Sequence, residues 1–148
     1  MWFKFIGVLL LLRPHMIRPF SSHRDFFRYR SVNRRKFKEM KNYKNCVEDH
    51  HIIPKQWKHH ELLQTLEFDV NHSQNLYIMP KYNAKKRFYL HPDTLIHEGG
   101  HKSYNKYVKT QLDYVYSLNN DRQRYEFWLL LHHLKANIRD NRDNIPWK

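Results

Sequence analysis

Two histidines spaced four residues apart could together bind a metal ion. The stretch "IHEGGHKSYN" contains His97, Glu98 and His101 in the pattern H-E-x-x-H. In the middle of a helix this pattern holds Zn²⁺ between its two imidazoles and presents the glutamate as a general base for peptide hydrolysis. Gly99 and Gly100 oppose that interpretation, because two glycines in a helix interior cost roughly 2 kcal/mol relative to alanine. The pair therefore indicates a metal site close to the beginning of a helix.

A zinc protease would also require a third ligand from the downstream sequence. In one large class of these enzymes a histidine follows six residues after the second ligand, and Tyr107 occupies that position here. Glu126 could serve instead, but no feature of its neighbourhood supports it. The protease is the less favoured alternative, and it requires Glu98 to be essential for activity.

A second pair of histidines lies at the end of a segment that should be extended. The stretch "CVEDHHIIP" carries β-branched residues and stops at Pro54, which predicts a short strand running into a loop. Successive side chains of a strand point to opposite faces, so His50 and His51 can serve different functions. One can bind a metal ion while the other faces a substrate. Downstream, Asn75 opens the stretch "NLYIMP", which predicts a second short strand.

The order of these pieces resembles the HNH, or His-Me finger, nucleases, and within them the branch named for its Ala-His-His motif. The matching stretches are "HHIIP", "NLYIMP" and "IHEGGHKSYNKYV", and the similarity covers roughly residues 46–115. The chain departs from the branch at Asp49, where a small residue is typical, and at Gly100, beside Gly99. The resemblance implies an α+β fold in which a small ββα-metal finger is embedded among helices, with a helical C-terminus. It implies a metal-dependent endonuclease that hydrolyses phosphodiester bonds.

The resemblance also implies a role for each residue of the site. His50 would bind a divalent metal ion together with His97 and His101, which would lie on the first turn of the following helix, and His51 would be the general base. An imidazole with its ordinary pKa near 6.5 suits that role at neutral pH. Asn75 would hold the loop between the two strands by side-chain hydrogen bonds and so orient His51. Mg²⁺ is the expected cofactor, with Zn²⁺ or another transition metal as alternatives because imidazoles favour them.

The charge of the chain predicts a polyanionic partner such as nucleic acid, and for the nuclease we expect DNA rather than RNA, although the charge does not distinguish them. The formal net charge is +13, but residues 1–45 hold 12 of the 27 Lys and Arg residues and only 2 of the 14 acidic ones. In the remaining, mildly basic part, Lys85, Lys86 and Arg87 fall between the second strand and the His97 pair. We interpret them as part of a solvated loop, with contact to phosphate as the less favoured alternative.

The cysteine count and the resemblance bear on the class of function and on the partners of the chain. The single cysteine excludes a disulfide framework and a Cys-rich zinc finger. A non-catalytic nucleic-acid-binding module, in which the same histidines hold a structural zinc, is the main alternative to the nuclease. Several relatives of the family it resembles are toxins, so an inhibitor or immunity protein is a candidate partner.

The elements that must position these residues are predicted by local patterns. The stretch "QWKHHELLQTLEF" indicates a short helix, because its apolar residues have near-helical spacing. Tyr104, Tyr107, Val108, Leu112 and Val115 share one face of a further helix. A last amphipathic helix should cover about residues 121–139, with Asp121 as its N-cap.

The chain divides into four segments of different composition. Residues 1–22, an apolar run followed by an arginine- and serine-containing stretch, resemble a mitochondrial presequence, with a secretory signal or short membrane anchor as the alternative. A mitochondrial location is therefore slightly favoured, and a membrane is a partner only if this segment is retained. The other segments are a basic arm outside the folded core (23–45), the nuclease-like domain (46–118) and a C-terminal helix packing on it (119–148).

Overall fold

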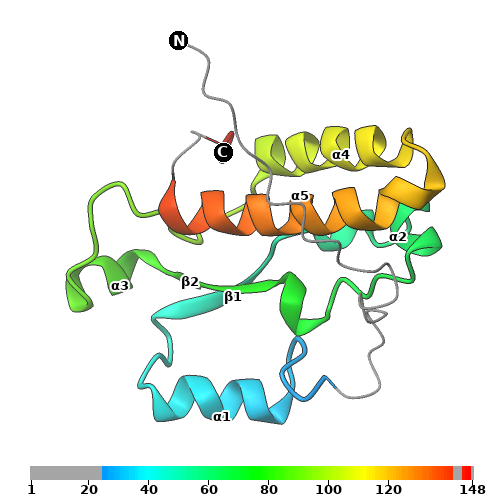
Figure 1. The fold of residues 1–148 in the computed structure, drawn as a ribbon. Coiled ribbons are helices and arrows are strands. Elements are labelled where there is room, and N and C mark those ends of the chain that lie inside the picture. Colours follow the sequence, from blue (N-terminus) through cyan, green and yellow to red (C-terminus); the bar gives the residue numbers. More distant parts are fainter. Residues whose placement is uncertain (1–24, 142–144, 148) are drawn as a thin grey trace, which may run out of the picture.

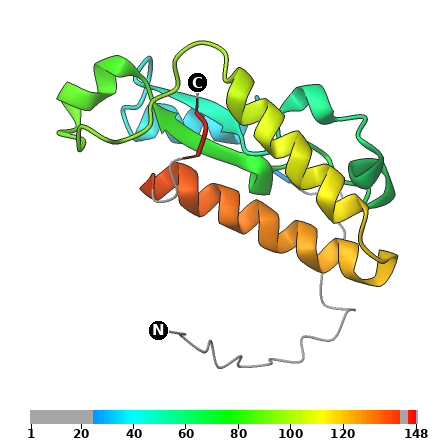
Figure 2. The same ribbon diagram turned by 90° about the horizontal axis from the view of Figure 1, so that it is seen from above.

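The computed structural model describes residues 25–141 and 145–147 (Figures 1 and 2), so the predicted targeting segment lies outside the described residues. The fold is α+β, as predicted, and consists of helices around a two-stranded sheet. In chain order the elements are α1 (Val32–Met40), β1 (Val47–His51), α2 (Glu61–Thr65), β2 (Leu76–Pro80), α3 (Tyr82–Arg87), α4 (Lys102–Tyr116) and α5 (Asn120–Asp140). Within these ranges no helix combines the length and the apolar character needed to cross a membrane.

The two predicted strands pair as a two-stranded antiparallel sheet. His50 lies opposite Tyr77 and His51 opposite Leu76. Because side chains alternate along a strand, Glu48 and His50 lie on one face of the sheet, whereas Asp49 and His51 lie on the other. Figure 1 shows α4 and α5 on one side of this sheet and α1 on the other side. The two adjacent histidines are therefore presented to different surroundings.

The apolar core lies between the two-stranded sheet and the helices α2, α4 and α5. The predicted apolar face of α4 is confirmed, with Tyr104, Val108, Leu112 and Val115 buried. The last helix begins at Asn120, because Asn119 accepts a hydrogen bond from the backbone N–H of Asp121 at 3.2 Å. The cap is thus Asn119 and not Asp121 as predicted, a difference of two residues.

Helix α1 is built from the segment that the sequence indicated to be a basic arm outside the core. Ser31 caps it by accepting a hydrogen bond from the backbone N–H of Arg34 at 3.2 Å. Arg34 Nε donates to Asp49 Oδ1 at 2.8 Å, and Lys38 Nζ to Asp49 Oδ2 at 3.0 Å. Cationic residues are normally exposed, which is why the segment reads as solvated. Arg34 and Lys38 are nevertheless paired with Asp49 on β1, and no local pattern in the sequence predicts this pairing.

The three basic residues predicted in a loop instead occupy the end of α3. Arg87 donates to the Cys46 sulfur at 3.0 Å, and Lys85 donates to the backbone oxygen of Pro92 at 2.5 Å, while Lys86 is exposed. Cations are stabilised in the last turn of a helix by its dipole. These contacts and the helix end explain the position of the three basic residues, and their contact with substrate stays a prediction.

Candidate functional site

The three histidines predicted to bind a metal ion lie together. Each of His50, His97 and His101 offers one ring nitrogen, and these atoms all lie within 4.8 Å of one another. The ring centroids are 5.5 Å apart for His50 and His97, 5.5 Å for His50 and His101, and 5.3 Å for His97 and His101. His50 comes from β1, His97 from the loop before α4, and His101 is the N-cap residue of α4.

The H-E-x-x-H stretch is not helical. Helix α4 begins after it, at Lys102, and Gly99 has a φ of +64°, in the left-handed region that glycine tolerates. The predicted helix entrance is thus confirmed, but His97 lies in the preceding loop and not on the first turn. Its backbone N–H donates to the carbonyl oxygen of Pro80 at 2.8 Å, which ties the loop to the end of β2. Glu98 is exposed, so the mid-helix arrangement of a zinc protease is absent here.

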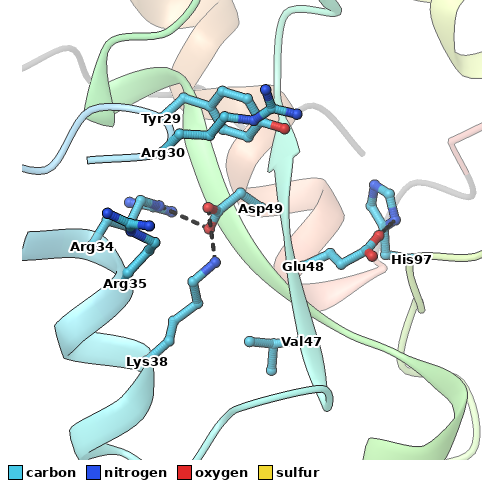
Figure 3. Close-up of a pocket in the computed structure, with 9 residues that line it drawn as sticks. All are labelled: Tyr29, Arg30, Arg34, Arg35, Lys38, Val47, Glu48, Asp49 and His97. Atoms are coloured by element: carbon cyan, nitrogen blue, oxygen red, sulfur yellow. Dashed lines mark hydrogen bonds and ion pairs between the residues drawn. The ribbon is translucent and has the colours of Figure 1, made fainter. Parts of the chain in front are cut away.

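Hydrogen bonds set the orientation of two of the three imidazoles. His97 Nδ1 lies 2.8 Å from a Glu48 carboxylate oxygen (Figure 3), and His101 Nδ1 lies 3.2 Å from the carbonyl oxygen of Trp147. With an acceptor at each Nδ1, the neutral form of either ring carries its proton on Nδ1 and keeps the lone pair of Nε2 free for a metal ion. Metal-binding histidines in proteins are typically held in this way, by a carboxylate or a carbonyl oxygen on the other ring nitrogen.

Two ring nitrogens of the triad are buried without a partner. In the part of the chain that the structure describes, His50 Nε2 and His101 Nε2 have no hydrogen bond although neither is accessible to solvent. Buried polar atoms in proteins are almost always paired. A metal ion between the three rings would satisfy both atoms, and neutral imidazole nitrogens suit a divalent transition metal. The residues present therefore fit a metal ion.

The surroundings of His50 and His101 favour the unprotonated, ligating form of these two rings. Burial, and then the neighbouring His97 and His101, lowers the pKa of His50 to about 3. Burial also lowers the pKa of His101. The hydrogen bond from Lys81 lowers the pKa of Glu48, so its carboxylate remains charged beside His97. At neutral pH His50 and His101 therefore need not lose protons before they bind a metal ion.

The C-terminal segment covers the triad, which the sequence did not predict. The Trp147 ring centroid lies 4.1 Å from that of His101 and 5.0 Å from that of His50. Its indole Nε1 donates to the carbonyl oxygen of Ile96 at 3.1 Å. Trp147 lies 46 positions after His101 in the chain, so no local spacing could have connected them.

We expect Trp147→Ala to weaken the binding of Zn²⁺ about 10- to 100-fold, the usual effect of losing a partner that orients a ligand. Without the indole ring the segment loses its bond to Ile96, and the carbonyl oxygen that orients His101 is released. Competition with a chromophoric chelator measures the affinity. Trp128→Ala, which removes a half-buried indole away from the triad, is the control. Equal Zn²⁺ affinities for the two variants would contradict the positioning role.

His51 faces away from the triad, toward a different set of residues. Its Nε2 lies 3.3 Å from the side-chain oxygen of Asn71, and the Tyr29 ring packs against it edge-on with centroids 4.6 Å apart. If Nε2 carries the proton donated to Asn71, Nδ1 keeps the lone pair. Burial, followed by the charge of Lys55, lowers the pKa of His51 to about 4, so the ring is neutral at pH 7. Asn71 and Tyr29 were not predicted.

Asn75 is fully buried and holds the loop that follows β1. Its side-chain oxygen accepts from the backbone N–H of Ile53 at 2.7 Å, and its amide donates to the carbonyl oxygens of Ile53 and Val70 at 3.0 and 2.8 Å. Tyr104 supports the same loop by donating to the carbonyl oxygen of Ile52 at 2.6 Å. These bonds match the loop-holding function expected of Asn75, while the side chain that contacts the His51 ring is Asn71.

Comparison with known protein families gives a match over most of the chain. The AHH family model, described as a nuclease family of the HNH/ENDO VII superfamily with conserved AHH, matches residues 32–137. The match runs from the start of α1 into α5 and includes the three histidines of the triad and His51. No curated protein and no solved structure matches the chain.

Proposed function

Because the chain belongs to the AHH family, a nuclease family of the HNH/ENDO VII superfamily, we propose that it is a metal-dependent endonuclease with His51 as its general base. The observation that carries the proposal is the triad of His50, His97 and His101, two of whose buried ring nitrogens have no partner among the residues that the structure describes. DNA is the favoured substrate, as the sequence indicated. Strand β1 alone supplies a metal ligand, His50, and the base, His51, at adjacent positions on opposite faces.

The three histidines would hold one divalent ion, for which Mg²⁺ is our first candidate and Zn²⁺ the second. Such an ion supplies positive charge to the phosphate and to the departing oxygen. The chain contributes the arrangement around it. Glu48 and the carbonyl oxygen of Trp147 fix the directions of the His97 and His101 rings, and burial keeps His50 unprotonated.

His51 would act on the attacking water. The free lone pair on Nδ1 accepts a proton as the water oxygen bonds to phosphorus, while Nε2 remains held by Asn71. The bond between phosphorus and the 3′ oxygen breaks, and the leaving oxygen takes a proton from solvent. The products are a 5′-phosphate and a 3′-hydroxyl, and His51 returns its proton to solvent.

Asp49, which stands where the family has a small residue, is compatible with this site. It lies on the face of β1 opposite the triad, and both of its carboxylate oxygens are bound by Arg34 and Lys38. It therefore neither crowds the triad nor competes as a ligand. The departure from the family motif gives α1 its attachment to β1, and His50, His97 and His101 still lie together.

The test is cleavage of supercoiled plasmid DNA by the purified full chain, with an RNA substrate in parallel. We expect nicked and linear DNA with Mg²⁺, Mn²⁺ or Zn²⁺ and no product with EDTA, because chelation removes the charge that the phosphate requires. The product ends should carry 5′-phosphates, which ligation without a kinase measures. Nicking of a closed circle identifies an endonuclease.

One outcome would contradict the proposed nuclease, and one variant tests the protease alternative. Stoichiometric zinc binding without cleavage under any condition would indicate the non-catalytic module with a structural zinc. Glu98→Ala serves as the control for the protease-like reading of H-E-x-x-H. Because Glu98 is exposed in the loop before α4, we expect this variant to cleave normally.

A further inference from the structure

A groove separates α1 from β1 on the face of the sheet that carries His51. Its volume is about 380 Å³, and a second hollow of about 180 Å³ shares Arg35, Lys38 and Val47 with it and continues toward Lys44. We refer to the two together as the α1 groove. Figure 3 shows the cationic side chains of α1 reaching toward β1, with His97 beyond the strand. Charged side chains line the larger hollow: Arg30, Arg34, Arg35, Lys38, Glu48 and Asp49.

The cations of the α1 groove differ in whether a carboxylate neutralises them. Arg34 and Lys38 both bind Asp49, as described above. In the described ranges, 25–141 and 145–147, no carboxylate pairs with Arg30 or Arg35, and both side chains are exposed. Two further acids line the groove: Glu48 is bound by Lys81 at 2.8 Å and by His97, and Glu39 lines the smaller hollow without forming an ion pair with Arg35 among the described residues. Positive charge without a partner therefore remains at two arginines.

One of these arginines is held close to the candidate base. The guanidinium of Arg30 lies 5.2 Å from the centroid of the Tyr29 ring, and that ring packs on His51. The backbone N–H of Tyr29 donates to the carbonyl oxygen of Asn71 at 2.9 Å, which ties this turn to the segment that also holds His51. Tyr29 and His97 both line the groove. An anion in the α1 groove would thus lie beside the residues proposed for hydrolysis.

We propose that the α1 groove binds the sugar-phosphate backbone of the nucleic acid next to the scissile phosphate, with Arg30 and Arg35 contacting phosphates. The inference rests on the proposed nuclease function. Guanidinium groups present a fork of donors that matches phosphate oxygens. Two adjoining hollows along α1 fit a chain of phosphates better than a single anion. Contacts to phosphate carry no sequence information, so this surface favours cleavage with little sequence preference.

Binding measurements with the full chain in EDTA test the groove without cleavage. Fluorescence anisotropy would follow a labelled DNA duplex and an RNA duplex of equal sequence across a range of salt concentrations. We expect Arg30→Gln/Arg35→Gln to weaken binding roughly 10- to 100-fold at 0.1 M salt. We also expect the salt dependence of log K to fall by about two, because each phosphate contact contributes about one.

The control variant is Lys36→Gln/Lys41→Gln. It removes the same charge from exposed positions of α1 and its C-cap that do not line the groove. Weaker binding of either duplex by the arginine variant alone supports the proposal and identifies the nucleic acid concerned. Equal affinities and equal salt slopes for the two variants on both duplexes overturn it.

Cleavage assays run in parallel separate this inference from the function on which it rests. If the unsubstituted chain cleaves with metal ions but the arginine and lysine variants bind alike, the groove assignment fails and the nuclease proposal stands. If the unsubstituted chain never cleaves although the arginine variant loses binding, the nuclease proposal fails, and the groove assignment stands only as binding of the nucleic-acid backbone, with no scissile phosphate.

Discussion

We expect His51→Ala to lower the rate of metal-dependent cleavage by about two to four orders of magnitude, the usual contribution of a general base. The affinity for the metal ion should not change, because the imidazole of His51 lies on the opposite face of β1 from the triad. Its ring contacts are Asn71 and Tyr29, and neither residue belongs to the triad. Loss of catalysis and loss of metal binding are therefore separable at two neighbouring positions.

Initial rates of plasmid nicking at saturating metal ion measure the first quantity, and chelator competition measures the second. His50→Ala provides the contrast, because it removes a metal ligand and should lower metal affinity and cleavage together. His59→Ala replaces an exposed histidine and should leave both quantities unchanged. Full cleavage by His51→Ala would show that another group deprotonates the water. Loss of metal affinity in that variant would show that the two faces of β1 are coupled.

The three histidines of the triad could be predicted because their residue type, their spacing and their order along the chain are all visible in the sequence. A histidine pair at the end of a strand and a second pair at i, i+4 are visible in the sequence. The same spacing misled in one respect, since it suggested that His97 and His101 share a helical turn. What brings His97 to the site is a backbone hydrogen bond to Pro80, and backbone pairing between a loop and a strand end leaves no pattern of residue types.

The residues that orient the histidines could not be predicted, because each comes from another part of the chain or from an unremarkable position. Asn71 contacts His51 across 20 positions, and Trp147 contacts His101 across 46. Glu48 sits two residues before His50 and has no feature that assigns it to His97. Such contacts follow from the packing of the whole fold, whereas ligand spacing follows from one or two elements.

Helix α1 shows how composition can hide a structural position. Its basic residues suggested an arm that neutralises phosphates and takes no part in the core. Arg34 is nevertheless buried, and its charge is matched by a carboxylate on β1 15 positions away. Arg35, its neighbour, is exposed and is one of the two residues for which we propose contact with phosphate. The same short helix thus combines a cation that holds the fold with one available to a ligand.

We expect Asp49→Ala to lower the free energy of unfolding by about 3–5 kcal/mol, because it leaves the Arg34 guanidinium buried without its partner. The side chains of Asp49 and Arg34 are only 6% and 8% exposed, and Lys38 also loses its acceptor. Urea denaturation followed by circular dichroism measures the change. Asp113→Ala is the matched control, since Asp113 also binds two partners, Lys109 and His60, but is 51% exposed. Its loss should cost less than about 1 kcal/mol.

A double variant distinguishes the lost charge pairing from a lost shape. In Arg34→Met/Asp49→Leu both buried charges are replaced by apolar groups, which in other proteins is often neutral. Lys38 is partly exposed and can turn to solvent, so most of the lost stability should return. Equal destabilisation by Asp49→Ala and Asp113→Ala would show that α1 is not held through Asp49. If α1 is held there, Asp49→Ala should weaken nucleic-acid binding while the triad, on the other face of β1, keeps its affinity for the metal ion.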